Sequence, residues 1–112
     1  MQGCACEMTV MGMAEGQHSD GPLIEHMGRV IRRDLPNLTL STEQNAKNWG
    51  SDDVSVMMNR VQAHGGQATY MRAMTDMAGA QHTVTFDFDE AVLGRSVAVF
   101  CAAAMEMMGD QQ

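Results

Sequence analysis

Three segments of the chain carry apolar side chains three to four residues apart, the spacing of an amphipathic helix. The first helix is expected over residues 22–34, where Pro36 ends it. The second is expected from a cap at Ser51 to about residue 64, and the third from Asp87 or Asp89 to about residue 108. The predicted buried stripes are Leu23, Ile24, Met27, Val30 and Ile31; Val54, Met57, Met58 and Val61; and Leu93, Val97, Phe100, Cys101, Ala104 and Met108.

Three other segments favour strands. In residues 4–14, Cys4, Cys6, Met8 and Val10 share one face by alternation, which predicts a strand with buried thiols. Shorter strands are expected over residues 38–41 and over residues 68–74, with a loop from 75 to 85. Strands that alternate with helices indicate an α/β fold of βαβαβα order with a mostly parallel sheet.

Composition narrows the classes of function. The 112 residues are enough for one small domain, and the formal net charge of −7 comes without a basic patch, so nucleic acid is not an expected partner. The N-terminus lacks the pattern of a signal peptide, and no apolar run of about 18 residues is free of charge, so no membrane span is expected. These features predict a cytoplasmic protein.

His82 is the first candidate for chemistry, because a neutral imidazole on a loop is a common zinc ligand. On spacing alone, a single loop histidine is more often solvated. Asp87, Asp89 and Glu90 offer carboxylates, but their place before a helix favours capping and interaction with the helix dipole. Other interpretations stay open for a few residues: exposure or ligation for His18, exposure for His26 and His64, and burial rather than metal binding for Cys4 and Cys6.

Longer motifs resemble a known family. His82 followed by Phe86-Asp87-Phe88-Asp89-Glu90, the segment Gly50-Ser51-Asp52-Asp53, and the run Val61-Gln62-Ala63-His64-Gly65-Gly66-Gln67-Ala68-Thr69-Tyr70-Met71 carry the likeness. Together they resemble the C-terminal part of the dizinc amidohydrolases and peptidases, a family that includes aminoacylase, carboxypeptidase G and auxin-conjugate hydrolases. The third run is especially similar to the aminobenzoyl-glutamate hydrolase branch. The sequence departs from the family pattern at Gln81 and Thr83, on either side of the candidate ligand.

The resemblance implies a partial three-layer zinc-peptidase-like domain. Residues 1–16 would be the last strand of the lid (dimerisation) domain, and residues 17–112 the C-terminal part of the catalytic domain. His82 would bind one zinc ion, and Ser51, Asp52 and Asp53 would line the active site. The family's other ligands and its glutamate general base have no counterpart in this sequence.

The expected function is therefore the C-terminal portion of a metal-dependent amidohydrolase that cleaves amide bonds of N-acyl or aminobenzoyl amino acids. Such a portion is not expected to be active as an isolated chain, because a zinc site needs three or four protein ligands and a general base. Its partners would be a small acyl-amino-acid substrate and either a second copy of the chain or a separate N-terminal chain. Two alternatives stay open: a truncated fold without catalytic activity, and a small interaction protein that docks on a partner through methionine-rich surfaces.

Overall fold

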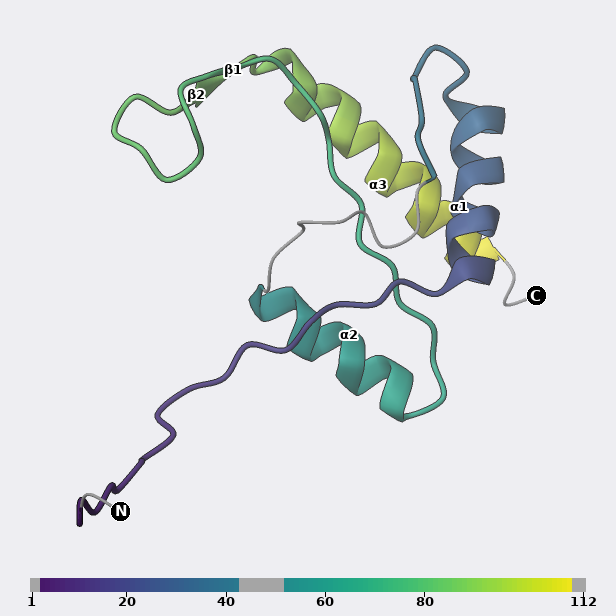
Figure 1. Cartoon of the computed structure of the whole chain (residues 1–112). Coiled ribbons are helices and arrows are strands. Elements are labelled where there is room, and N and C mark those ends of the chain that lie inside the picture. The colour runs from purple at the N-terminus through teal and green to yellow at the C-terminus, as the bar shows by residue number, and fades with distance from the viewer. Residues whose placement is uncertain (1–2, 43–51, 110–112) are drawn as a thin grey trace.

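The computed structural model describes residues 3–42 and 52–109, whose regular elements are three helices and a short antiparallel β-ribbon (Figure 1). Each helix forms where the hydrophobic pattern predicts one. The helices are α1 (Gly21–Asp34), α2 (Asp53–Ala63) and α3 (Ala91–Gly109), and the ribbon pairs β1 (Met77–Ala78) with β2 (Asp87–Phe88).

The bounds of α1 follow from its end residues. Asp20 takes the N-cap position with an extended backbone, and its carbonyl oxygen accepts the Ile24 N–H at 3.0 Å. Pro22 lies in the first turn, where its missing N–H leaves no helical bond unmade. The helix ends at Asp34, two residues before Pro36, because a proline disfavours the helical conformation of the residue that precedes it.

The small hydrophobic core lies between α1 and α3. Met27 and Val30 of α1 are buried against Ala103 of α3, and half-buried side chains from both helices extend this cluster. Gly28 lets residues 40–42 run back across α1, since a Cβ there would lie 3.2 Å from the Thr42 Cγ2. The predicted buried stripe of α1 is confirmed.

The predicted stripe of α3 is wrong, because it faces outward. Leu93, Val97 and Phe100 are exposed, and the helix buries Val92 and Ala103 instead. The helix is apolar on nearly every side, so periodicity alone does not select the side that packs on α1. The stripe of α2 is wrong in part in the same way: Met58 is buried, while Met57 and Val61 are exposed.

None of the three expected strands forms within residues 3–42 and 52–109. A strand is stabilised by the ladder of hydrogen bonds to a neighbouring strand, and the segments 4–14, 38–41 and 68–74 have no such ladder there. Cys4 and Cys6 are accordingly exposed rather than buried. The three-layer fold and the division at residue 16 stay predictions.

The chain does not close into a compact body. Its radius of gyration is 18.8 Å, whereas a compact domain of 100 residues has about 13 Å. In Figure 1 the N-terminal segment extends away from the helices, and α2 lies apart from the α1–α3 pair. Among the described elements, α3 packs on α1 and the two short strands pair, but α2 packs on neither of the other helices.

Candidate metal-ligand loop

His82 lies in the exposed loop between β1 and β2, at the end of the ribbon farthest from α1 (Figure 1). The ribbon is in register with Met77 opposite Phe88 and Ala78 opposite Asp87. His82 has a φ of 65°, and it is the one residue other than glycine with a positive φ in the described ranges. This left-handed conformation costs an ordinary side chain about 1–2 kcal/mol, so the surrounding loop must impose it.

Local contacts hold the loop in shape. Gly79 has a φ of 76°, and a Cβ there would lie 2.7 Å from the Thr85 carbonyl oxygen, so the two sides of the loop approach closely only because Gly79 has no side chain. The Thr83 hydroxyl donates to the Ala80 carbonyl oxygen at 2.7 Å, and the Phe86 N–H donates to the Thr83 carbonyl oxygen at 3.2 Å. Within the described residues, the contacts that shape the backbone around His82 come from the loop itself.

Asp87 and Asp89, which follow His82, accept hydrogen bonds from backbone N–H groups. One oxygen of Asp89 accepts the Ala91 N–H at 2.9 Å and so caps α3, while the Asp89 N–H donates to the Asp76 carbonyl oxygen at 3.3 Å. Asp87 accepts the N–H of Phe88 at 2.9 Å. The capping interpretation is confirmed for Asp89.

The described residues do not gather a set of zinc ligands around His82. Zinc sites use three or four protein ligands, and residues 3–42 and 52–109 contain no group of three His, Cys, Asp or Glu side chains placed to share a metal ion. His82 is therefore a single candidate ligand on an exposed loop.

The second predicted site segment lies at the start of α2. Ser51 falls outside the described residues. Asp52 takes the N-cap position without a hydrogen bond from its side chain, and Asp53 stands in the first turn, where a negative charge interacts favourably with the helix dipole. In Figure 1 this end of α2 and the ribbon that carries His82 lie apart, so the structure does not bring the two predicted segments together.

The polar network around Asp20 was not predicted from the sequence. The Asp20 carboxylate accepts hydrogen bonds from the Gln62 side chain and from the Ala68 N–H, both at 2.8 Å. The Asp20 N–H donates to the Ala68 carbonyl oxygen at 2.9 Å. These bonds join the start of α1 to the chain beyond α2, and the backbone bond from Ala68, followed by the bond from Gln62, lowers the pKa of Asp20.

Ser55 connects α2 to the N-terminal segment. Its side chain is fully buried, and its hydroxyl donates to the Glu15 carbonyl oxygen at 2.6 Å and also contacts that of Asp52. The Asn59 side chain reaches the Glu15 carboxylate at 2.5 Å. Ser55 and Asn59 are four positions apart and so lie on one side of α2, and this polar spacing is the sequence signal for the contact.

Ion pairs connect α1 and α3 beside the core. One oxygen of Glu106 lies 3.3 Å from the His26 Nε2, and the other accepts a bond from Arg33 at 2.9 Å. Arg33 also binds Asp34 through two bonds of 2.6 and 2.9 Å, which lower the pKa of Asp34 and raise that of Arg33. His26 is thus paired with a carboxylate rather than free in solvent.

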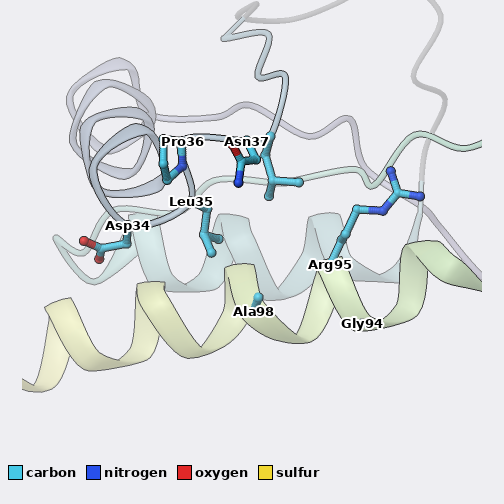
Figure 2. A pocket seen from close by; sticks show the side chains of 8 residues that line it. Asp34, Leu35, Pro36, Asn37, Gly94, Arg95 and Ala98 are labelled. Carbon is cyan, nitrogen blue, oxygen red and sulfur yellow. The ribbon is translucent and has the colours of Figure 1, made fainter.

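A shallow hollow of about 280 Å³ lies between the loop after α1 and the first half of α3. Figure 2 shows Leu35 pointing from the loop toward α3, near Ala98, and Arg95 rising from α3 on the side of the loop. Its volume is at the lower limit for small-molecule sites. His82, Asp52 and Asp53 are not among its lining residues, so it does not unite the predicted site.

Comparison with known proteins identifies relatives among hydrolases. The chain is 30% identical over 105 residues, or 94% of its length, to indole-3-acetyl-aspartic acid hydrolase from Enterobacter agglomerans. It is 45% identical over 56 residues, half of its length, to one subunit of the p-aminobenzoyl-glutamate hydrolase from Escherichia coli. It is 29% identical over 104 residues to the homologue of that subunit from Haemophilus influenzae, a match that covers 93% of the chain.

These matches cover 24%, 13% and 24% of the three relatives, so the chain spans about a quarter of their length or less. No family model matches the sequence, and no solved structure resembles it closely enough to be matched. The predicted likeness to aminobenzoyl-glutamate hydrolases is confirmed. The chain is therefore a relative of the amidohydrolases of this family, and its sequence corresponds to a segment of about a quarter of their length.

Proposed function

We propose that this chain forms the C-terminal portion of an amidohydrolase that cleaves the amide bond between an acyl or aminobenzoyl group and an amino acid. The observation that carries the proposal is the match to the three hydrolases. Their names describe two substrates, indole-3-acetyl-aspartate and p-aminobenzoyl-glutamate, and each joins an aromatic acyl group to an acidic amino acid. The substrate class proposed for the complete enzyme is therefore an aromatic acyl conjugate of an acidic amino acid.

His82 is the residue that this chain contributes to the metal shell. Its imidazole lies on an exposed loop, where it can bind a metal ion that ligands from another segment also hold, and the loop around it imposes its left-handed backbone. The described residues offer no second and third ligand nearby, so the remaining zinc ligands and the general base come from polypeptide outside this sequence. The isolated chain consequently has no hydrolytic activity of its own.

The complete enzyme therefore contains more polypeptide than these 112 residues, either as a longer chain or as a separate partner chain. The word "subunit" in the names of two relatives supports an assembly of more than one chain. We propose a cytoplasmic location for this assembly.

A chimera tests this function. The chain replaces the matching segment of the Enterobacter agglomerans hydrolase, because that match covers nearly the whole chain. The chimera should bind zinc and hydrolyse indole-3-acetyl-aspartate, and His82→Ala should lower kcat by about 100-fold or more and reduce the zinc content.

His64→Ala is the matched control. His64 is an exposed histidine at the C-terminal end of α2, and its Nδ1 lies 2.7 Å from the Arg60 carbonyl oxygen. It should leave kcat and zinc content unchanged. A soluble chimera whose zinc content and kcat respond equally to both substitutions would rule out His82 as a ligand.

The exposed methionines favour a second candidate function, in which the chain is a small interaction protein without catalysis. Met8, Met11 and Met13 are all exposed, and methionine is common on adaptable binding surfaces. A soluble chimera that is inactive, together with a stable complex between the chain and an unrelated protein, would favour this candidate over the amidohydrolase.

A further inference from the structure

The outer face of α3 is a continuous apolar surface, defined here as Leu93, Val97, Phe100, Ala104 and Met108. These residues are spaced by four, three, four and four positions, so they follow one side of the helix over its whole length. All five are exposed, with Val97 at 61% and Phe100 at 67%. No charged residue belongs to this face.

The opposite side of α3 is already covered. Val92 and Ala103 are buried there, and the ion pair of Glu106 with Arg33 fastens the helix to α1. Arg95 and Glu106 are eleven positions apart, which places both charges on about the same side of the helix. The helix is therefore apolar on both sides, and its charged residues lie only on the packed side. This pattern is typical of a helix that other protein covers on both sides.

We propose that the outer face of α3 docks onto an uncharged, apolar face of the polypeptide that supplies the rest of the amidohydrolase fold. This inference rests on the proposed function. The relatives contain about three times as much additional sequence as the segment that this chain matches, and that additional polypeptide has to adjoin the segment somewhere. The outer face of α3 runs over most of a 19-residue helix and carries no charge, so it suits this contact.

A second copy of the chain, paired through α3, would cover too little of the exposed apolar surface. Other apolar side chains are exposed on α2 and on the N-terminal segment, and pairing of α3 with its copy would leave them in water. They are Val56, Met57 and Val61 on α2, and Met8, Val10, Met11 and Met13 on the segment. The radius of gyration of 18.8 Å exceeds the roughly 13 Å of a compact domain of 100 residues, so the elements of this chain leave much of one another's apolar surface uncovered.

A lipid bilayer is a second alternative, because α3 is long and apolar enough to cross a membrane by length and composition. Its ion pair to α1 argues against this occupant. Insertion would carry Glu106 and its partners Arg33 and His26 toward the hydrocarbon layer or break their contacts. The core helix of a globular protein meets the same criterion of length and composition.

The experiment compares Phe100→Asp with Phe100→Leu in two settings, the isolated chain and the chimera with the Enterobacter agglomerans hydrolase. In the isolated chain Phe100 faces solvent, so both variants should keep the helix content and the melting curve measured by circular dichroism. In the chimera Phe100→Asp should lower Tm by about 5 °C or more or abolish soluble expression, whereas Phe100→Leu should behave like the unaltered chimera.

The docking proposal is overturned if Phe100→Asp leaves Tm of the chimera unchanged, or if the unaltered chimera is insoluble while the natural hydrolase is not. It is also overturned if the isolated chain forms a dimer in size-exclusion chromatography, or binds vesicles of phosphatidylcholine and phosphatidylglycerol, and Phe100→Asp abolishes that association. A stable but inactive chimera that is sensitive to Phe100→Asp would support docking and contradict only the proposed function.

Discussion

The α1–α3 pair and the β1–β2 ribbon show two ways in which this chain holds a side chain in place. Between the helices, Met27 and Val30 are buried against Ala103, and an ion pair through Glu106 adds a polar contact at the same interface. The ribbon carries His82 on an exposed loop whose hydrogen bonds and ring contacts all lie within a few residues. The first region depends on residues far apart in the sequence, and the second almost entirely on near neighbours.

The helix pair contributes mainly to stability, whereas the ribbon carries the candidate functional residue. The helix pair contains the hydrophobic core among the described residues, so it determines whether the chain folds. The ribbon contributes little burial, and its loop carries the candidate zinc ligand in an exposed, left-handed backbone conformation. Substitutions in the two regions should therefore change different measurements.

The largest effect is expected from Met27→Ala in the core. Met27 is only 4% exposed, and truncation of a buried methionine typically costs about 2–5 kcal/mol. Because the core is small, the free energy of unfolding is expected to be low. The variant should therefore show no cooperative thermal unfolding transition by circular dichroism. Met11→Ala, at a side chain that is 96% exposed, is the control and should melt as the parent does. Equal melting of both variants would show that the α1–α3 core does not limit stability.

Gly79→Ala should disturb the ribbon without unfolding the helices. A Cβ at this position would meet the Thr85 carbonyl oxygen at 2.7 Å, and the φ of 76° adds a cost of about 1–2 kcal/mol. Amide hydrogen exchange measured by NMR should become faster in β1 and β2 and stay unchanged in α1. Gly94→Ala in α3 is the control, because a Cβ there meets no atom within 4 Å, and it should stabilise the helix by about 1 kcal/mol. If the ribbon keeps its protection in Gly79→Ala, its loop is not held by this close approach.

Acidification should destabilise the network that joins α1 to the chain beyond α2. The pKa of Asp20 is below its ordinary value in the folded protein, so its contribution to stability is complete above pH 3.8 and is lost as the pH falls through the lowered pKa. Thermal unfolding followed from pH 7 to pH 2 should show this loss. Asp20→Asn keeps an acceptor oxygen but has no titrating carboxyl, so its stability should depend less on pH in that range. If the stability of Asp20→Asn depended on pH as the parent's does, protonation of Asp20 would not be the cause of the acid destabilisation.

Glu106→Gln should have the smallest effect of the four. It removes the charge that pairs with Arg33 and His26 but keeps a side chain of the same shape, and partly exposed ion pairs contribute little to stability. Tm should fall by a few degrees or less at low salt, and the difference from the parent should disappear at high salt because of screening. Glu25→Gln, on the exposed side of α1, is the control. A large loss that salt does not change would indicate that Glu106 acts through packing.

The sequence predicted the helices better than the strands, and for a physical reason. Pro22 in the first turn of α1, Pro36 just after that helix and the glycines after α2 act within one or two turns, and they set the observed ends. A strand needs a neighbouring strand to hydrogen-bond to, and a local sequence pattern does not identify that neighbour. Within the described residues, no such neighbour pairs with the segments 4–14, 38–41 and 68–74. The ribbon at β1 and β2 was missed because two residues in each strand are too few to show alternation.

The candidate site was predictable in its chemistry but not in its geometry. His82 and the capping role of Asp89 could be proposed from residue type and position, and the cap is observed. The two bonds that Asp20 accepts could not be proposed, because they join segments that meet only in three dimensions. The predicted segment at Asp52 and Asp53 lies apart from His82 in this structure.

The amino-acid sequence by itself determined where the three helices form, which family of hydrolases the chain resembles, and which histidine is the candidate zinc ligand. Helix formation and capping depend on residues within a few positions of one another, so a linear pattern is sufficient for them. Only the tertiary structure decided which side of α3 packs on α1, which side stays open, and how Asp20 links distant segments. An apolar side chain favours burial against any apolar surface, and the surface that covers it is chosen by contacts between residues far apart in the sequence.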